Sequence, residues 1–201
     1  MQHTLLLGGV NLRVLDIGCG NGVLGLWAAK KLRARVVGID ISNAAIGNSR
    51  KNARNLCLVA TYACADAEDW LKKDRRKYDL IIANTPSFPD SSYRSERGNR
   101  FLAKGNGTGN RLLMTIAENV HRVLDAGGYL LTMAHSEQNI PLVVRCMRRQ
   151  FSEVRVFEQE PKIPNVGIFR SMRIRHVAHG YWTKDINGRF RGRSIVILAR
   201  R

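Results

Sequence analysis

Apolar positions along the chain fall into short continuous runs and longer stretches with helical spacing. Continuous aliphatic and β-branched runs predict buried strands, because a strand covered on both faces has no polar side. Apolar spacings of three and four residues predict amphipathic helices. The predicted strands are Leu12–Ile17, Arg35–Asp40, Leu58–Ala63, Tyr78–Ala83, Gly128–Ala134, Val154–Phe157 and Ser194–Ala199. The predicted helices are Val23–Leu32, Asn43–Asn55, Gly109–Leu124 and Glu137–Gln150.

This alternation predicts an α/β fold in which a mostly parallel sheet carries helices on both faces. Right-handed crossovers place the loops after each strand along one edge of such a sheet, where ligands bind. The 201 residues suit a single domain, 1–201, and no stretch has the composition of an interdomain linker. A basic insertion at about 161–193 precedes the last predicted strand.

A glycine-rich turn directly follows the first predicted strand. Residues Asp16–Gly22 read Asp-Ile-Gly-Cys-Gly-Asn-Gly, and a predicted helix begins at Val23. Glycines let the backbone turn tightly and approach a ligand closely. The next strand ends in Asp40, whose carboxylate can accept hydrogen bonds from both hydroxyls of a ribose. Together these features predict a nucleotide-like cofactor, and a dinucleotide is one alternative.

Two acids favour S-adenosylmethionine over a dinucleotide. Asp16 precedes the glycines, where it would repel a pyrophosphate but suit the cationic methionine end of S-adenosylmethionine. Asp66 follows the third predicted strand and can accept a hydrogen bond from an adenine amino group. The segment Asp16–Gly22 resembles motif I of class I methyltransferases, and Asp40 and Asp66 match their ribose-binding and adenine-contacting acids.

The resemblance covers about Leu12–Gln150 together with the final predicted strand. It implies a Rossmann-like, doubly wound, mostly parallel seven-stranded sheet with a C-terminal antiparallel strand. It also implies S-adenosyl-L-methionine as cofactor. The cofactor-binding residues expected on this basis are Asp16, Gly18, Cys19, Gly20, Asp40, Ile41, Asp66, Ala67 and Asn84.

A second motif follows the fourth predicted strand. Residues Asn84–Pro89 read Asn-Thr-Pro-Ser-Phe-Pro, similar to the Asn-Pro-Pro-Tyr motif of methyltransferases that act on amino or amide nitrogens. The amide oxygen of Asn84 can accept an N–H bond of such a nitrogen and orient it toward the methyl donor. Pro86 would keep the loop rigid, and Phe88 would stack on a flat target. The predicted catalytic residues are therefore Asn84, Pro86 and Phe88.

The chain departs from this motif, because Thr85 replaces a proline and Ser87 stands where the aromatic residue is expected. Three hypotheses follow. The first is an N-methyltransferase acting on an exocyclic amino group of rRNA or tRNA. The second is a glutamine N-methyltransferase acting on a translation factor. The third is a methyltransferase-like protein that binds RNA, as a ribosome assembly factor, with weak or no catalysis.

Charge favours an RNA or a ribosomal particle as partner. Lys and Arg total 33 against 16 Asp and Glu, a net charge of +17. Residues 161–201 hold ten Lys and Arg against one Asp, interleaved with aromatic residues. Arginines grip phosphates and aromatic rings stack on bases, although the segment could also be a hairpin whose rings pack on the sheet. The predicted nucleic-acid contacts are Arg170, Arg173, Arg175, Arg189, Arg191 and Arg193.

Other features predict an intracellular protein, in the cytoplasm or an organelle matrix, with neither metal nor membrane span. No apolar run reaches the length of about 18 residues that a membrane helix needs. Cys19, Cys57, Cys64 and Cys146 form no C-x-x-C pair, so zinc and disulfides are not expected. The spacing His176-x-x-His179 has no third ligand near it in the sequence.

Overall fold

The computed structural model describes residues 11–85, 111–159, 182–184, 186–187 and 190–201. Its main feature is a seven-stranded sheet with the order β3-β2-β1-β4-β5-β9-β6. The strands are β1 (Arg13–Ile17), β2 (Arg35–Asp40), β3 (Ala60–Cys64), β4 (Tyr78–Ala83), β5 (Leu124–His135), β6 (Glu153–Glu158) and β9 (Ser194–Arg200). Strands β1, β2, β3, β4 and β5 run parallel to one another, whereas β9 is antiparallel to both β5 and β6. The predicted fold class is confirmed.

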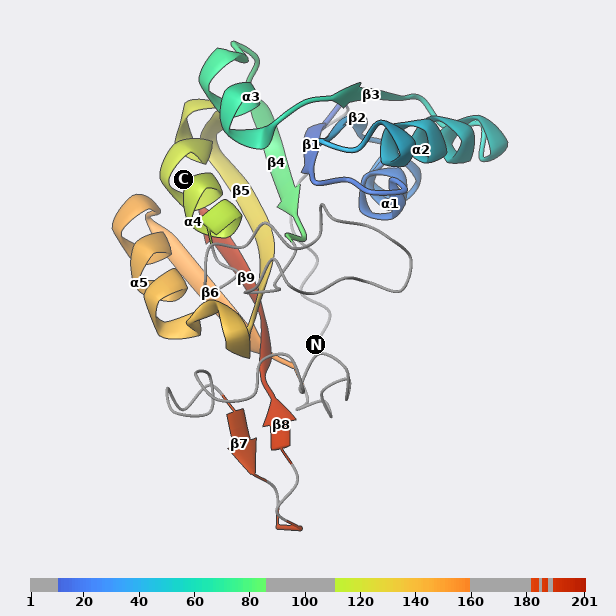
Figure 1. Cartoon of the computed structure of the whole chain (residues 1–201). Coiled ribbons are helices and arrows are strands. Elements are labelled where there is room, and N and C mark those ends of the chain that lie inside the picture. The colour runs from blue at the N-terminus through green and yellow to red at the C-terminus, as the bar shows by residue number, and fades with distance from the viewer. Residues whose placement is uncertain (1–10, 86–110, 160–181, 185, 188–189) are drawn as a thin grey trace.

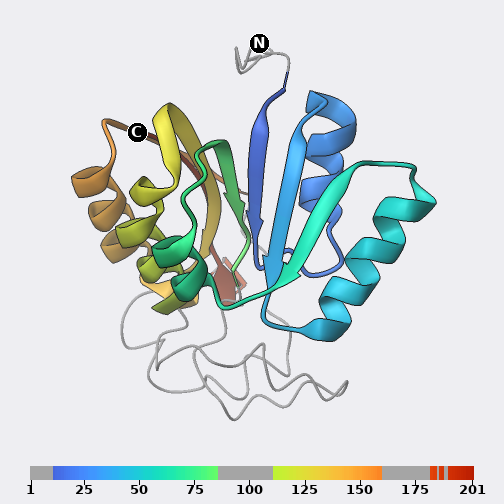
Figure 2. The ribbon, with the colours of Figure 1, turned by 90° about the horizontal axis from the view of Figure 1, so that it is seen from above.

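Helices cover both faces of the sheet. They are α1 (Val23–Leu32), α2 (Asn43–Asn55), α3 (Ala67–Lys73), α4 (Arg111–Asn119) and α5 (Ile140–Gln150). Helices α1 and α2 lie on one face, and α3, α4 and α5 lie on the other (Figures 1 and 2). Within the described ranges, no helix is long and apolar enough to cross a membrane.

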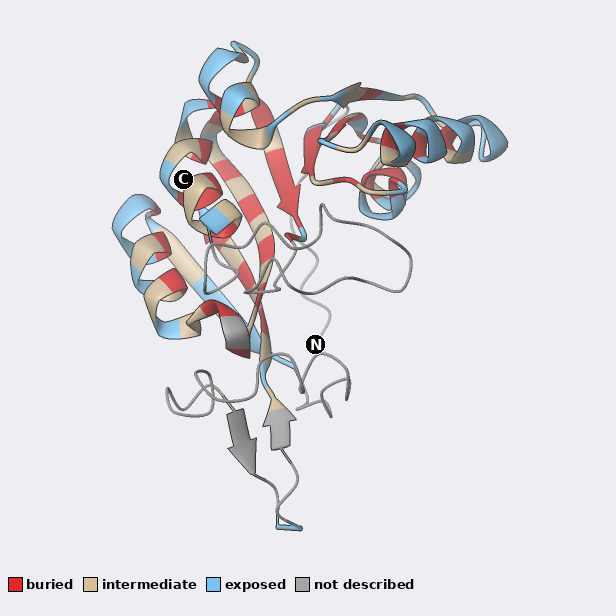
Figure 3. Ribbon diagram, in the orientation of Figure 1, coloured by how far each residue is buried: buried red, intermediate tan, exposed pale blue. Residues whose placement is uncertain are grey.

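The largest hydrophobic core lies between the central strands and the layer formed by α3, α4 and α5. Leu15, Ile81, Leu130 and Ile197 come from four different strands and are fully buried. Figure 3 shows this buried band along the middle of the sheet. Burying one such side chain contributes about 1.5–3 kcal/mol, so the core holds the strand ends in a fixed arrangement.

The structure corrects several predicted boundaries. The helix predicted to reach Leu124 ends at Asn119, and after a short 3₁₀ turn, η2 (Val120–Arg122), strand β5 already begins at Leu124. Apolar residues in that turn continue the helical spacing, which explains the error. The helix predicted from Glu137 is divided into a 3₁₀ turn, η3 (Ser136–Gln138), and α5. Asn139 separates them because its left-handed backbone, at φ 54°, interrupts the helix.

Helix α3 was not predicted, because it has only seven residues and one buried position. The local signals for this helix are its N-cap residue, Asp66, and two oppositely charged pairs with the spacing i, i+4. Lys72 and Lys73 each form an ion pair with an acid one turn earlier, Glu68 and Asp69. The first two residues of the cationic run 72–77 are therefore paired helix residues.

A second, two-stranded sheet forms within the predicted basic insertion. Strand β7 (Trp182–Lys184) pairs antiparallel with β8 (Phe190–Gly192), and one residue separates β8 from β9 (Figure 1). A hairpin was one of the two interpretations of this segment. Binding of RNA by the hairpin stays a prediction, since backbone pairing does not test it.

Candidate functional site

The carboxyl ends of β2, β1 and β4 lie side by side and in register. Ile17 of β1 pairs with Ile39 of β2 on one side and with Ala83 of β4 on the other. Neighbouring strands are about 4.8 Å apart, and the arrowheads of β1 and β2 point to this edge in Figure 2. The residues that follow this row are Asp40, Gly18 and Asn84. The fold thus brings the two predicted motifs to one edge of the sheet.

The glycine turn leaves room for a ligand above its backbone. Gly18 and Gly20 have left-handed φ angles of 68° and 55°, and a Cβ atom added to either would meet nothing within 4 Å. A Cβ atom on Gly22 would instead lie 2.8 Å from the Tyr62 hydroxyl. Gly18 and Gly20 therefore border open space, as a cofactor cradle requires, whereas Gly22 is needed for packing.

Asp16 lies beneath this turn. It is 1% exposed, and its Oδ2 accepts a hydrogen bond of 2.8 Å from the backbone N–H of Gly25 in α1. Burial raises the pKa of Asp16 to about 6, although the bond from Gly25 opposes the shift. The carboxylate therefore fixes the turn against α1, and its contact with the methionine end of the cofactor stays a prediction.

The buried Asp16 should make stability fall with rising pH. Its pKa rises from 3.8 to about 6 on folding, so the folded state binds more protons between these values. The free energy of unfolding should then decrease by up to about 3 kcal/mol from pH 4 to above pH 6. Urea unfolding at a series of pH values measures this for the wild type and Asp16→Asn. Identical pH dependence in both proteins would contradict the assignment.

Asp40 links the glycine turn to the start of α2. Its Oδ2 accepts from the N–H of Gly20, and its Oδ1 accepts from the N–H of Ser42, each at 2.9 Å. Each carboxylate oxygen has a second lone pair that could accept a ribose hydroxyl. The next residue, Ile41, is 47% exposed and offers an apolar surface for a flat base.

Cys19 packs within the turn as a neutral side chain. It is buried, and its N–H donates to the carbonyl of Ile39 at 2.9 Å. Burial, together with the charges of Asp16 and Asp40, raises the pKa of the thiol to about 12. A protonated thiol is a poor nucleophile, so we expect Cys19 to act as a small buried apolar side chain.

Asp66 caps helix α3. Its Oδ1 accepts from the N–H groups of Glu68 at 2.8 Å and Asp69 at 3.2 Å. The end of β3 is tied to β2, because the N–H of Ala65 donates to the carbonyl of Asp40 at 3.0 Å. Asp66 is exposed, and Ala67 begins the helix beside it. Contact of these two residues with adenine stays a prediction.

Asn84 is exposed at the end of β4, whereas the adjacent Thr85 is buried at 4% exposure. The hydroxyl of Thr85 has no hydrogen-bond partner among the described residues, and the carbonyl of Ala83 accepts from the Thr132 hydroxyl at 2.7 Å. Thr85 therefore faces inward and leaves Asn84 on the accessible side. Pro86 and Phe88 lie outside the described residues.

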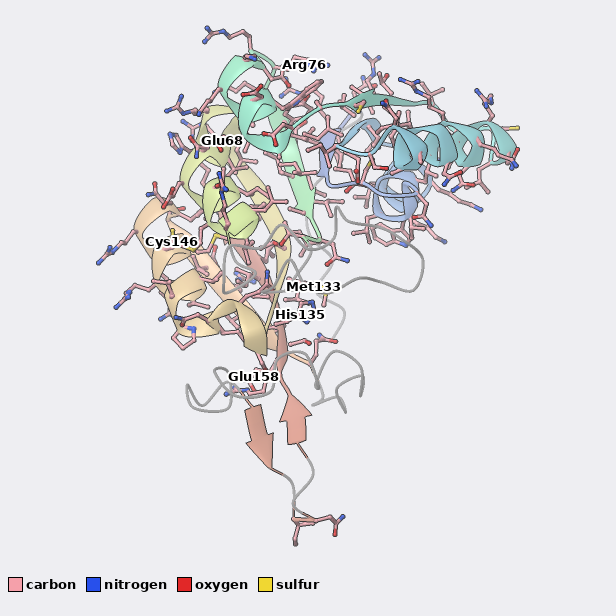
Figure 4. All side chains as sticks on the ribbon, in the orientation of Figure 1. Glu68, Arg76, Met133, His135, Cys146 and Glu158 are labelled. Carbon is pink, nitrogen blue, oxygen red and sulfur yellow. The ribbon has the colours of Figure 1, made fainter. Side chains whose placement is uncertain are left out.

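Strand β5 brings two further residues, Met133 and His135, to this edge of the sheet. Thr132 pairs with Ala83, so Met133 lies in the same row as Asn84, and β5 continues two residues further to His135. Figure 4 labels Met133 and His135 near this end of the strand. The Nδ1 atom of His135 lies 2.8 Å from the Ser194 hydroxyl. His135 was not among the predicted site residues, because the predicted strand ended at Ala134, one residue earlier. The polar side chain at the end of this strand was the available signal.

The structure describes two of the six predicted nucleic-acid contacts, Arg191 and Arg193. The guanidinium of Arg193 forms an ion pair with Glu158, and its backbone carbonyl accepts from Ser136. Arg191 lies on β8. Arg170, Arg173, Arg175 and Arg189 lie outside the described residues, as do His176 and His179. The described part of the chain contains no cluster of three or more metal-ligating side chains.

The open backbone at Gly18 and Gly20, the carboxylate of Asp40 and the exposed side chain of Ile41 together fit S-adenosylmethionine. A sequence profile described as a methyltransferase domain matches residues 9–178. The chain therefore belongs to this methyltransferase domain family, and its class is that of class I enzymes that use S-adenosylmethionine.

Two curated relatives are named as ribosomal protein L11 methyltransferases. A ribosomal protein L11 methyltransferase from an Exiguobacterium strain is 34% identical over 98 residues, which is 46% of this chain and 31% of that protein. A ribosomal protein L11 methyltransferase from Ralstonia pickettii is 38% identical over 77 residues, or 38% of this chain and 24% of that protein. The chain thus spans about a quarter to a third of these relatives.

Solved structures share the fold at low sequence identity. A 16S rRNA methyltransferase from Thermus thermophilus, in complex with AdoMet and guanosine, has a TM-score of 0.58 at 16% identity. The match covers 94% of this chain and 37% of that one. A precorrin-6y C5,15-methyltransferase from Geobacter metallireducens has a TM-score of 0.62 at 15% identity, and the match covers 98% and 84% of the two chains.

Proposed function

We propose that the protein methylates an exocyclic amino nitrogen of RNA, either rRNA or tRNA. The observation that carries the proposal is the position of Asn84. It is exposed at the end of β4 and lies in the row that contains Gly18 of the glycine turn. An amide there can hold a nitrogen next to the cofactor site, as the similarity to the Asn-Pro-Pro-Tyr motif implies.

The chemistry depends on orienting a weakly nucleophilic nitrogen. S-adenosylmethionine supplies an electrophilic methyl group on a sulfonium. The amide oxygen of Asn84 accepts an N–H bond of the acceptor and aligns its lone pair with that methyl group. The nitrogen gains the methyl group as the carbon–sulfur bond of the sulfonium breaks, and it releases one proton to water. A backbone carbonyl near Asn84 can accept the second N–H bond of the acceptor.

Charge and relatives support an RNA acceptor. The net charge of +17 favours a polyanionic partner in the cytoplasm or an organelle matrix. One structural neighbour is a 16S rRNA methyltransferase with bound guanosine. A protein acceptor, such as a ribosomal protein or the glutamine of a translation factor, is the second candidate, because the curated relatives are named as L11 methyltransferases.

Transfer of labelled methyl groups tests the proposal. The protein is incubated with labelled S-adenosylmethionine and, separately, with total RNA and total protein. Label in RNA is expected, and nuclease digestion should locate it on an amino nitrogen of a base. Label confined to the protein pool would support the second candidate. Absence of label from both pools would contradict methyl transfer and favour the RNA-binding assembly factor.

The basic insertion should contribute to RNA affinity. Replacing Arg173, Arg175, Arg189 and Arg191 with glutamine should weaken RNA binding and flatten its salt dependence, because fewer counterions are released. Gel-shift titrations at several salt concentrations measure both effects. The affinity for S-adenosylmethionine should stay unchanged. Equal loss in a variant with four neutralised arginines elsewhere would contradict a dedicated RNA-binding segment.

A further inference from the structure

The segment from Gly18 to Ala65 carries many cations and a single acid. That acid is Asp40, whose carboxylate is bound to backbone N–H groups at the cofactor edge. The seven cations are all exposed, and they are Lys30, Lys31, Arg33, Arg35, Arg50, Lys51 and Arg54. This part of the surface is therefore strongly positive and lacks the acids that balance cations elsewhere.

Four of these cations form a compact group, here called the basic corner: Lys30, Lys31, Arg33 and Arg35. Lys30 and Lys31 are in the last turn of α1, Arg33 caps that helix, and Arg35 begins β2. The N–H of Arg35 donates to the carbonyl of Leu12 at 2.7 Å, which fixes the group at the amino ends of the strands. Figure 2 shows the end of α1 and the start of β2 at the edge opposite the arrowheads.

No ion pair involves the basic corner within the described residues. Arg13, which lies opposite Arg35 on β1, already forms ion pairs with both Asp79 and Asp125. Lysines in the last turn of a helix interact favourably with its dipole. That explanation covers Lys30 and Lys31, but it does not extend to Arg35 in a strand.

Arg33 is placed against the preference of the backbone. Its φ of 52° and ψ of 35° lie in the left-handed region, where glycine is usual at the end of a helix. A glycine would relieve this strain, so fold stability does not account for an arginine here. One turn earlier on α1, Trp27 is 56% exposed and shares a helix face with Lys30 and Lys31.

We propose that the basic corner and Trp27 form a docking site for RNA, separate from the methyl-transfer site. The cations bind phosphates and the indole stacks on an unpaired base. Strand β2 has six residues and separates Arg35 of the corner from Asp40 by about 17 Å. An RNA that contacts both sites must span that distance, so a folded RNA is the substrate and a single nucleotide is not. The inference rests on the proposed function in taking the docked RNA to carry the methyl acceptor.

RNA fits this surface better than an anionic membrane does. Helices that bind membrane surfaces insert an apolar face into the lipid. In α1, Leu26 and Ala28 are buried, and the exposed apolar side chains are limited to Val23, Leu24 and Trp27 in the first half of the helix, ahead of the basic corner. The exposed cations and one indole match the phosphates and bases of a nucleic acid.

Two triple variants with equal charge changes test the site. The first is Lys30→Gln, Lys31→Gln and Arg35→Gln, and the matched control is Arg145→Gln, Arg148→Gln and Arg149→Gln on α5. The control residues are also exposed, but Arg145 and Arg149 share a groove with Glu118. Filter binding to protein-free total rRNA at several salt concentrations is the measurement. The corner variant should lose about tenfold in affinity and lower the salt slope by about 2–3.

Equal losses in the two variants would overturn the inference, because they would show only non-specific attraction. Loss of binding to phosphatidylserine vesicles with unchanged rRNA binding would overturn it in favour of a membrane. Both variants should retain wild-type affinity for S-adenosylmethionine. If neither RNA nor protein accepts label but the corner variant still loses rRNA affinity selectively, the docking site stands and the proposed methyl transfer fails.

Arg33→Gly separates docking from folding. Glycine removes the left-handed strain, so the melting temperature should stay the same or rise, whereas rRNA affinity should fall about two- to threefold through loss of one phosphate contact. Unchanged rRNA affinity in this variant would remove Arg33 from the site. A lower melting temperature would contradict the argument from its backbone conformation.

Discussion

Asn84→Ala should reduce the rate of methyl transfer by about 10²–10³-fold while leaving the affinity for S-adenosylmethionine within about twofold. The amide is exposed just after β4, and its side chain forms no hydrogen bond with another described residue, so its removal should leave the sheet intact. Single-turnover kinetics with the labelled acceptor pool measure the rate. Isothermal calorimetry measures cofactor binding.

Asn48→Ala provides the matched control, because it removes the same amide from an exposed position of α2. Its transfer rate should equal that of the wild type. A rate in Asn84→Ala equal to that in Asn48→Ala would end the assignment of Asn84 to the acceptor nitrogen. A weaker cofactor affinity with an unchanged rate at saturation would instead move Asn84 to the cofactor.

Asp40→Ala should weaken binding of S-adenosylmethionine by about 1–3 kcal/mol, or roughly five- to 150-fold. The variant removes a charged acceptor for ribose hydroxyls and also the acceptor of the Gly20 and Ser42 N–H groups. Both losses act on the cofactor cradle. Calorimetry with S-adenosylmethionine gives the affinity, and the near-UV circular dichroism of the free protein reports whether the fold is retained.

Asp69→Ala is the control for Asp40→Ala. Asp69 is an exposed acid whose ion pair with Lys73 lies on the surface of α3, so its loss should leave cofactor affinity unchanged. Asp40→Asn refines the result, because one amide oxygen can still accept a hydrogen bond. Its affinity should fall between those of the wild type and Asp40→Ala. Wild-type affinity in both Asp40 variants would exclude Asp40 from the ribose site.

The sequence predicted the central strands well, because both of their faces are buried. Continuous apolar runs mark β1, β2 and β4. Asp40 ends β2 and Asn84 directly follows β4, and both carry polar side chains of the candidate site. Parallel topology then brings these ends together without further information. The predicted methyltransferase fold follows from the same residues and is confirmed by the match to the domain family.

Elements defined by local polar contacts were harder to predict. Helix α3 depends on the Asp66 cap and on surface ion pairs, which leave little hydrophobic periodicity. The start of β5 at Leu124 depends on pairing with Tyr78, a contact far away in the sequence. The roles of Asp16 in binding Gly25 and of His135 beside Ser194 likewise depend on tertiary neighbours. Residue type alone does not reveal such partners.

The position of β9 between β5 and β6 has a consequence for folding during synthesis. Strand β6 ends at Glu158, but β9, which pairs with both neighbours, ends at Arg200. At ordinary translation rates, roughly 2–8 s separate the synthesis of these two points. Throughout that interval β5 and β6 have unpaired edges, and the buried positions that face Ile195 and Ile197 are open. A nascent chain at this stage is a substrate for chaperones, and premature release before β9 should favour aggregation over folding.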